Sequence, residues 1–342
     1  MPLLSGQDPQ ALAQAAQVLA DGGLLAFPTE TVYGLGARAD DEAAVAQIFA
    51  AKGRPADHPL IVHVTDASAA QAFAAHWPPA AQVLAQHFWP GPLTLIVPRR
   101  PGVGTAAAGG HASIGLRCPD HPVALDLLAR ARALGVLGVA GPSANRFGRV
   151  SPTTAAHVLD EFGPELPVLD GGACREGIES TIIDCTRTHP ALLRPGTTPR
   201  VMIEAVLREA LGLPLMERDE TSPKASGTLA SHYAPYAVVS LLSAAQLTQR
   251  LATFVADSPQ GEGLAQAPVA AVVGVYSRTA PPTRPGVLHR TMPAHPAQVA
   301  HELFAALRQF DAHGVRQIWV EAPPEGPEWD GVRDRLLRAA TR

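Results

Sequence analysis

The sequence predicts an α/β fold divided between two domains. Its 342 residues exceed the usual size of one domain, roughly 150 residues, and indicate about two. Short apolar runs alternate along the chain with stretches of helical length, which is the pattern of strands joined by helices. The run 269–276, VAAVVGVY, is apolar without alternation, as expected for a strand buried in a parallel sheet.

The composition is that of a globular protein. The chain is 46% hydrophobic and 17% charged, which argues against disorder. Its net charge of −4 argues against a protein that coats nucleic acid nonspecifically. Its three cysteines lack CxxC spacing, which suits a reduced compartment. No signal peptide is visible, and no apolar run reaches the ~20 residues that cross a bilayer. We therefore expect a cytoplasmic protein with no membrane partner.

The first elements have clear boundary signals. Asp8 and Pro9 precede an Ala/Leu-rich stretch that stops at Gly22-Gly23, which predicts a capped first helix. The segment 28–64 then reads as a loop, a helix and a strand after the strand 24–27, and we expect the chain to turn at Gly34 and Gly36. Three hydroxyls and an acid lie where the first strand ends: Thr29, Thr31, Tyr33 and Glu30. In open α/β sheets, ligands bind just beyond strand ends.

The remaining elements follow in order. The other expected strands are 60–64, 93–97, 113–117, 136–140, 180–185, 192–194, 238–242, 269–276, 287–291 and 317–321. The other expected helices are 40–52, 67–76, 80–88, 121–133, one capped by 151–153, 199–211, 244–256, 297–310 and 329–339. Three or four strands that alternate with helices after residue 238 predict a small Rossmann-like sheet.

Lysine usage singles out one position. Only two lysines occur, Lys52 and Lys224, among 27 basic residues. A chain so biased toward arginine retains lysine where a compact ammonium is needed. Lys52 and Arg54 therefore form a candidate pair for phosphate or carboxylate. The alternative is a solvated helix end, where cations are favourable in any case.

Two further segments carry polar chemistry. The loop 141–145, GPSAN, offers Ser143 and Asn145 to a phosphate or sugar, although the same residues also form ordinary turns. It is not a GxSxG nucleophile elbow. The segment 212–237 contains Lys224, His232, Tyr233 and Tyr236. Such aromatic residues indicate either a segment that folds over a ligand or a linker docked on a domain surface.

Eight motifs in order resemble one family. They are PTETVYGLG, KGRP with HPLIVHV, SIGLR, GPSAN, SPT, STIID, LRPG and HYAP. Together they resemble the L-threonylcarbamoyladenylate synthases in their two-domain form. The resemblance implies a YrdC-like domain over 1–211, with a twisted open mixed sheet around a basic cavity. It also implies a linker that covers the active site over 212–237 and a smaller Rossmann-like α/β domain over 238–342.

The resemblance also implies a reaction. The family joins L-threonine, bicarbonate or CO2, and ATP into threonylcarbamoyl-AMP, releasing pyrophosphate. This is the first step of tRNA N6-threonylcarbamoyladenosine modification, and a downstream tRNA threonylcarbamoyl-transfer enzyme uses the product. Mg2+ is expected with ATP, with no organic cofactor and no metal held by protein side chains alone. The chain contains no P-loop GxxxxGK[ST], so ATP must be held by scattered side chains and backbone amides.

The resemblance assigns site residues by matching motifs. The residues implied for threonine are Thr31, His63, Arg117, Ser180 and Thr181. Those implied for catalysis are Lys52, Arg54, Ser143 and Asn145. Those implied for ATP are Arg54, His58, Ser113, Ser143, Asn145, Ser151, Arg194 and Tyr233. His58 departs from the family pattern, which often has Asn there; if it contacts ATP, its protonation would add pH dependence near neutrality.

Three alternatives remain at this stage. A basic cavity could bind RNA without adenylyl transfer, although the expected cations are few and no RRM-type aromatic platform is present. A carbamoyl-transfer enzyme sharing the domain would carry zinc-finger cysteines that this chain lacks. A metal site would have to use His58, His63, His111 and His121, whose spacings match no common zinc pattern.

Overall fold

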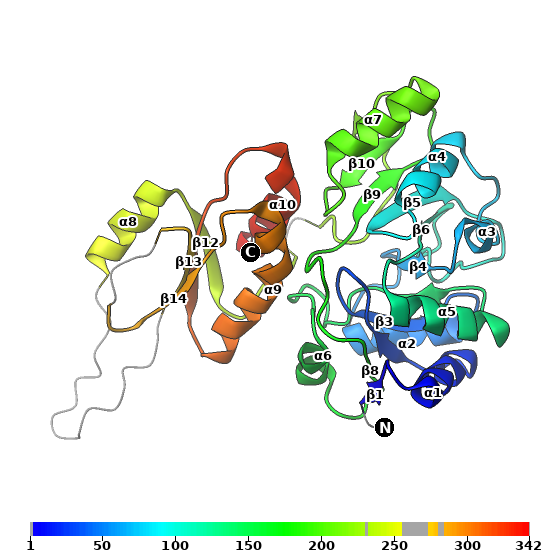
Figure 1. Ribbon diagram of the computed structural model, residues 1–342, viewed down its shortest axis with the longest axis horizontal. Coiled ribbons are helices and arrows are strands. Elements are labelled where there is room, and N and C mark those ends of the chain that lie inside the picture. The colour runs from blue at the N-terminus through cyan, green and yellow to red at the C-terminus, as the bar shows by residue number, and fades with distance from the viewer. Residues whose placement is uncertain (1–2, 230–231, 255–272, 280–283, 342) are drawn as a thin grey trace. The chain divides into compact units, whose positions relative to one another are not determined.

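The computed structural model describes residues 3–229, 232–254, 273–279 and 284–341 (Figure 1). The chain divides into two compact units. The first contains residues 1–147 and 151–229, and the second contains 148–150 and 230–342. Residues 212–229, which we expected in a linker, are thus part of the first unit. Of the strand expected over 269–276, residues 269–272 lie outside the described part.

The first unit contains one large sheet and seven helices among its described residues. Its strands are β1 (Leu4–Ser5), β2 (Leu25–Phe27), β3 (Gly34–Arg38), β4 (Ile61–His63), β5 (Leu93–Pro98), β6 (Ser113–Arg117), β7 (Val139–Ala140), β8 (Leu169–Asp170), β9 (Thr181–Asp184), β10 (Ala191–Arg194) and β11 (Met216–Glu217). Its helices are α1 (Pro9–Ala20), α2 (Glu42–Lys52), α3 (Ala67–Ala70), α4 (Pro79–Phe88), α5 (Pro122–Ala133), α6 (Ala155–Phe162) and α7 (Arg200–Leu211).

The large sheet is mixed, which confirms the predicted α/β class. Nine strands follow the order β11-β10-β9-β5-β6-β4-β7-β3-β2, and β1 pairs separately with β8. The central pair β4 and β6 is parallel, with His63 in register with Arg117. Strand β5 runs antiparallel to β6, and Leu95 pairs with Leu116. Because both parallel strands end at His63 and Arg117, these two side chains emerge together on one face.

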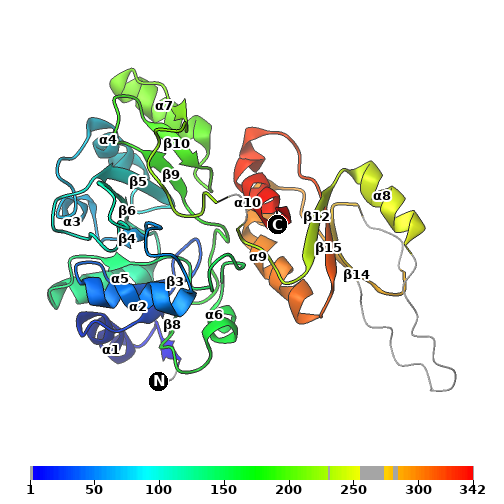
Figure 2. The same ribbon diagram turned by 180° about the vertical axis from the view of Figure 1, so that it is seen from behind.

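The two faces of this sheet are covered differently. Alternate residues of β4, β5 and β6, such as Val62, Leu95 and Leu116, join one core with α2, α4 and α7. Helices α1 and α5 pack over the opposite face at β2 and β7. Figures 1 and 2 show α4 and α7 near β5, β9 and β10, and α1 and α5 near β3 and β8. On the face that carries Arg117, strands β4, β5 and β9 present a small apolar group against which Ala225 packs.

Sequence signals place the helices that carry the site. Asp8 caps α1 by accepting a hydrogen bond from the Gln10 amide at 2.9 Å. Asp41 caps α2 in the same way through the amides of Ala43 and Ala44. Gly53 ends α2 in the left-handed region, with φ 63°. Asp41 and Gly53 thus set the two ends of α2, and Lys52 is its last residue.

The expected turn at Gly34 and Gly36 is wrong. Both glycines lie inside β3, which pairs antiparallel with β2. A Cβ at either position would lie 3.0 Å from ring carbons of Phe27. These glycines therefore make room for an aromatic ring on the neighbouring strand. Two smaller boundaries also differ from expectation: Thr154 rather than 151–153 caps α6, and the strand expected over 136–140 contains only Val139–Ala140.

The second unit is a small parallel α/β domain, as expected. Its described elements are β12 (Val238–Leu242), α8 (Ala244–Thr253), β13 (Val273–Ser277), β14 (Val287–Thr291), α9 (Pro296–Ala312), β15 (Gln317–Glu321), a 3-10 turn (Pro327–Trp329) and α10 (Asp330–Ala340). The strands follow the order β12-β15-β13-β14, and every pairing is parallel. Across the described part of both units, no helix has the length and apolarity to span a membrane.

Candidate active site

Arg117, at the end of β6, is fixed on three sides. Its Nη2 lies 2.6 Å from Oε1 of Glu30, and its Nη1 donates to Oγ1 of Thr31 at 2.9 Å. Its Nε donates to the Gly91 carbonyl at 3.3 Å. The side chain of Arg117 is 4% exposed and that of Glu30 1%. A buried ion pair of this kind holds the planar guanidinium in one orientation.

His63 lies beside Arg117 in the sheet and is neutral at ordinary pH. Its ring packs edge-on against Phe27, with 5.4 Å between the ring centroids. Burial, followed by the charge of Arg117, lowers the pKa of His63 to about 3. Gly141 approaches closely from the GPSAN loop, because a Cβ there would lie 3.0 Å from Nδ1 of His63.

Lys52 connects α2 to the GPSAN loop. Its Nζ donates to the Ser143 carbonyl at 2.6 Å and also to the Asn145 carbonyl. The Phe147 amide in turn donates to the Lys52 carbonyl at 2.8 Å. Burial, followed by the charge of Arg54, lowers the pKa of Lys52 well below its usual range. Lys52 is therefore not the solvated helix end that was the alternative at sequence level, since it is 3% exposed.

The GPSAN loop is also hydrogen-bonded to the segment that carries Thr31. The Leu35 amide donates to the Pro142 carbonyl, and the Ala144 amide donates to the Tyr33 carbonyl, both at 2.8 Å. An isolated antiparallel bridge joins Gly34 to Ser143. Lys52, Ser143, Thr31 and Arg117 thus belong to one continuous set of contacts.

Arg54 and His58 lie around one aromatic ring. The Arg54 guanidinium is 5.7 Å from the centroid of the Phe147 ring, and its Nη2 donates to the Pro59 carbonyl at 2.9 Å. The His58 ring lies 5.4 Å from the same ring of Phe147. Burial and then the charge of Arg54 lower the pKa of His58.

Ser113 begins β6, so it lies about 13 Å along the strand from Arg117.

Arg194 and Ser180 extend the polar group across the sheet. Arg194 Nη2 donates to the Ser180 carbonyl at 2.8 Å and to its hydroxyl at 3.2 Å. The Ser180 hydroxyl in turn lies 2.8 Å from the Thr94 hydroxyl. Because Leu95 pairs with Leu116, antiparallel register puts Thr94 next to Arg117. Arg194 is thereby linked to Arg117 across the face of the sheet.

Three predicted residues have other neighbours. The Thr181 hydroxyl donates to the Thr198 carbonyl at 2.8 Å, and strand alternation directs it away from the face of Ile182. The Ser151 hydroxyl donates to Oε1 of Glu179. Tyr233 belongs to the second unit, where its buried ring stacks on Phe304 at 5.5 Å between centroids. The predicted ligand contacts of these three residues stay predictions.

Sequence reasoning did not assign three buried residues that this site contains. Glu30 lies within the quoted PTET motif, but its ion pair with Arg117 was not predicted from the sequence. Glu179 precedes the quoted STIID motif, and Thr94 lies inside a strand. Strand register brings Thr94 next to Arg117, and Glu30, which precedes Thr31 in the chain, reaches Arg117 through an ion pair.

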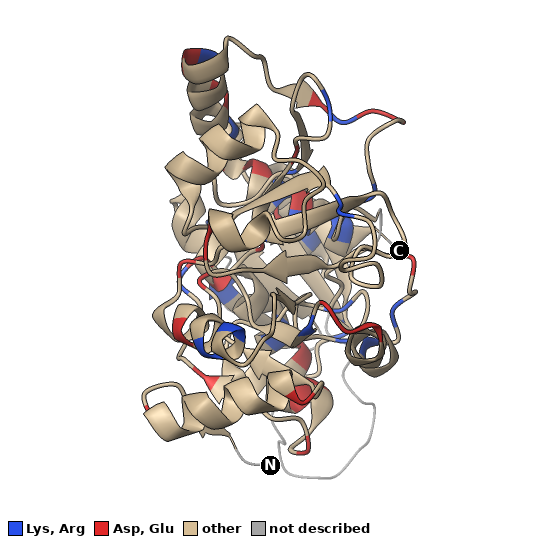
Figure 3. Ribbon diagram, turned by 90° about the vertical axis from the view of Figure 1, so that its right-hand side faces the viewer, with Lys and Arg blue, Asp and Glu red and all other residues tan. Residues whose placement is uncertain are grey.

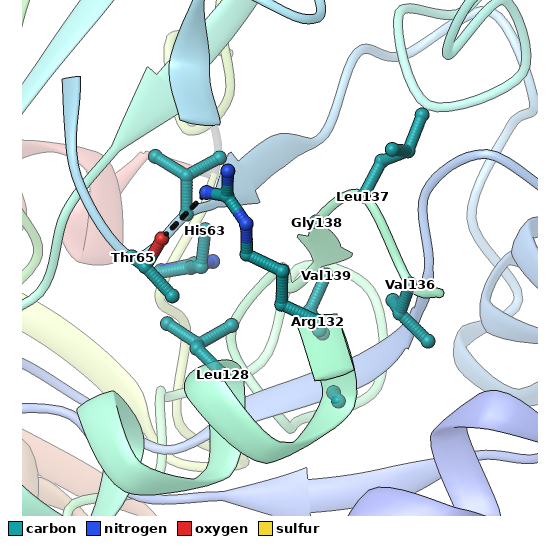
Figure 4. A pocket seen from close by; sticks show the side chains of 10 residues that line it. His63, Thr65, Leu128, Arg132, Val136, Leu137, Gly138 and Val139 are labelled. Carbon is teal, nitrogen blue, oxygen red and sulfur yellow. Dashed lines mark hydrogen bonds between the residues drawn. The ribbon is translucent and has the colours of Figure 1, made fainter. Parts of the chain in front are cut away.

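A recess next to His63 lies outside this group of contacts. It is lined by residues that include Leu128, Arg132 and Val136 (Figure 4). Arg132 reaches across it to the Thr65 hydroxyl at 3.0 Å. The recess has no interior space for a water molecule, so it offers nothing to a nucleotide.

Basic and acidic residues are mixed along the chain. In Figure 3 Lys and Arg are interspersed with Asp and Glu on helices and loops. Among the described residues, no three His, Cys, Asp or Glu side chains gather as metal ligands do.

The fold and the site together define an α/β protein that carries buried cations and hydroxyls on one face of a mixed sheet. More specifically, the chain belongs to the Sua5/YciO/YrdC family. The model of this family, described as telomere recombination, matches residues 17–196. A second model, described as the threonylcarbamoyl-AMP synthase C-terminal domain, matches residues 199–341. The family resemblance that the motifs indicated is confirmed.

Curated relatives cover nearly the whole chain. The threonylcarbamoyl-AMP synthases of Pyrococcus abyssi and Bacillus subtilis are each 38% identical to it. The alignment with the P. abyssi protein covers 95% of this chain and 93% of that protein. The alignment with the B. subtilis protein covers 98% of this chain and 94% of that protein. A solved structure of P. abyssi Sua5 complexed with L-threonine has a TM-score of 0.84 at 34% identity, covering 99% of this chain and 97% of that chain.

Proposed function

We propose that this protein synthesises threonylcarbamoyl-AMP from L-threonine, bicarbonate or CO2, and ATP, releasing pyrophosphate. The observation that carries the proposal is the continuous contact set of Lys52, Ser143, Thr31 and Arg117 beside one face of the sheet. Relatives of nearly the same length carry this activity in their names. RNA binding without adenylyl transfer is not favoured by these relatives.

Threonine binds next to Arg117 in this proposal. A solved relative is described as complexed with L-threonine. The fixed fork of Arg117 suits an α-carboxylate, because guanidinium and carboxylate pair through two parallel hydrogen bonds. Neutral His63 and the hydroxyls of Thr31 and Ser180 can hydrogen-bond the remainder of the amino acid without adding charge.

ATP binds along Lys52, Arg54 and the GPSAN loop. An ammonium has three donors, and Lys52 gives two of them to the carbonyls of Ser143 and Asn145. The third is available to a phosphate oxygen. A phosphate there would oppose the effect of burial and favour the charged form of Lys52. Arg54 adds a second cation close to the same loop, as two-point recognition of a polyphosphate requires.

The reaction needs positioning more than a nucleophilic side chain. The neutral amine of threonine forms a bond to the carbon of CO2 and gives up a proton to solvent water, which leaves a carbamate. A carbamate oxygen then attacks the α-phosphorus of ATP, the bond to the β-phosphate oxygen breaks, and pyrophosphate leaves. Negative charge develops on phosphate oxygens, so the fixed cations Lys52 and Arg54 contribute through electrostatic stabilisation.

Mg2+ would enter with ATP. Protein sites usually hold this ion through one or two carboxylates together with substrate phosphates. The buried carboxylate of Glu179, bonded to Ser151, is an oxygen donor of the required type. When bound, Mg2+ would neutralise part of the phosphate charge. We further propose that the product passes to a tRNA threonylcarbamoyl-transfer enzyme in the cytoplasm.

Incubation with ATP, L-threonine, bicarbonate and Mg2+ tests the proposal directly. Mass spectrometry should detect threonylcarbamoyl-AMP only when all three substrates are present. Lys52→Ala is the inactive control, with its fold checked by circular dichroism. Pyrophosphate release that does not depend on threonine would contradict the proposal, as would RNA binding without any adenylate product.

A further inference from the structure

Residues 148–150 fold with the second unit although the chain on both sides belongs to the first. This short segment follows the GPSAN loop and ends immediately before Ser151. Arg149 forms a parallel bridge with Ala234, and the Ala234 amide donates to the Gly148 carbonyl at 2.9 Å. The segment therefore pairs like a strand with the stretch that follows Tyr233.

Asp311 fastens this pairing through both of its oxygens. Oδ2 accepts a hydrogen bond from the Tyr236 amide at 2.8 Å, and Oδ1 accepts one from the Ala237 amide at 3.0 Å. Arg149 Nη2 lies 3.3 Å from the same Oδ2, and its guanidinium lies 3.3 Å from the centroid of the Tyr236 ring. Arg308 adds a hydrogen bond from Nη2 to the Val150 carbonyl.

The location of Asp311 on its helix supports a tertiary role. It is the penultimate residue of α9, where the helix dipole disfavours a negative charge. Its carboxylate therefore does not stabilise the helix that carries it. It is used to bind two backbone amides and one guanidinium, and it is largely buried, with a side-chain exposure of 12%.

The chain on both sides of the segment bears the proposed ATP site. Asn145 lies four residues before Arg149, and Ser151 lies two residues after it. The Phe147 amide is bonded to the Lys52 carbonyl, and the Tyr33 amide is bonded to the Pro152 carbonyl. With at most ~3.6 Å of chain per residue, a fixed Arg149 limits how far Asn145 and Ser151 can move.

We propose that Asp311 is a positioning residue for the ATP site. By holding Arg149, it fixes the short segment between Asn145 and Ser151, which continues directly from the loop that Lys52 binds. The prediction that ATP binding is affected rests on the proposed function. The prediction that Asp311 immobilises residues 143–152 is independent of that function.

The test compares Asp311→Asn with the matched control Glu302→Gln in the full chain. Glu302 lies on the same helix and binds Arg290 and the Tyr276 hydroxyl, so its variant removes a comparable charge away from the segment. Asp311→Asn should raise KM for ATP about tenfold, the factor expected from one weakened charge-assisted contact. KM for threonine should stay within about twofold, and the control should change neither constant.

A second measurement does not depend on activity. Hydrogen exchange of the Phe147 and Ala144 amides should accelerate in Asp311→Asn, while amides of β6 keep their protection. Arg149→Leu should reproduce both effects, and the double variant should be no worse than either single variant. Unchanged exchange at residues 143–152 overturns the proposal, as does an equal rise of both KM values. Failure of the wild-type chain to form adenylate would overturn the proposed function instead.

Discussion

Arg117 shows how one buried side chain can be prepared for a substrate. Glu30, Thr31 and Gly91 each occupy a different nitrogen of the guanidinium. A lysine at this position cannot satisfy three partners in these directions and also present a planar edge. The orientation of the cation, more than its charge, is what the site requires.

Arg117→Lys is therefore expected to weaken threonine binding at least about tenfold. Binding of ATP, measured separately by calorimetry, should change little, because Lys52 and Arg54 are retained. Arg130→Lys is a suitable control, since Arg130 pairs with the partly exposed Asp126 on α5. Threonine affinity equal to that of the wild type would remove Arg117 from the site.

His63 makes stability depend on pH. Its pKa is lowered to about 3 by burial, whereas an unfolded histidine titrates near 6.5. Between these values the unfolded state binds the extra proton, so stability falls as pH falls below about 6.5. We expect His63 to account for about 2 kcal/mol of lost unfolding free energy between pH 6.5 and pH 5.

Urea unfolding at both pH values measures this effect. In His63→Gln the decrease between pH 6.5 and pH 5 should be smaller by about the same amount. An identical decrease in the wild type and the variant would show that His63 is not the buried neutral group responsible.

At the scale of elements, β3 shows where the sequence misled. Gly34 and Gly36 have the composition of a turn, yet they form a strand because Phe27 on β2 needs the space above them. The contact between β2 and β3 determines the conformation of these glycines. Local residue propensities do not include such a contact between strands. Helices α1 and α2 were predictable because their caps, Asp8 and Asp41 with Gly53, act within a few residues of the chain.

Gly36→Ala tests this account of β3. Its Cβ would lie 3.0 Å from Phe27 and 3.0 Å from Val139, so we expect a loss of about 1–3 kcal/mol in unfolding free energy by urea titration. Combining it with Phe27→Leu, which removes the ring, should cost less than the sum of the two single changes. Strict additivity would mean that the glycine is needed for another reason.

Most residues proposed for the site were named from the sequence, whereas the roles of Glu30, Glu179 and Thr94 and the contacts among all of these residues were not. Lys52 stood out because lysine is rare in this chain, and motif order brought in Arg117, Ser143 and Arg194. That Lys52 holds the loop through carbonyl oxygens, and that Thr94 joins Ser180 to the site, follows only from the folded sheet. Contacts between residues ~90 apart have no local signature in a single sequence.

At the scale of the whole molecule, residues 212–229 complete the first unit. Ser226 accepts a hydrogen bond from Arg194 Nη1 at 3.0 Å, Ala225 packs on the apolar group of β4, β5 and β9, and Lys224 pairs with Asp57. Strand β11 also adds to the sheet at β10. A cut after Leu211 removes all of these contacts, whereas a cut after Leu229 keeps them.

We therefore expect residues 1–229 to be more stable than residues 1–211 by about 2 kcal/mol or more in urea unfolding. Both fragments should form threonylcarbamoyl-AMP only weakly, since each lacks Asp311 and Tyr233. Equal stability of the two fragments would contradict the assignment of 212–229 to the first unit. Full activity of either fragment would contradict a role for the second unit.

The central claim is that one site on the first unit holds an amino acid and a triphosphate together. The most direct measurement is a crystal structure of the full chain with L-threonine and a non-hydrolysable ATP analogue. The account predicts the threonine carboxylate against Arg117 and the phosphates against Lys52, Arg54 and the 141–145 loop. Ligands bound elsewhere, with Arg117 and Lys52 free of them, would contradict it.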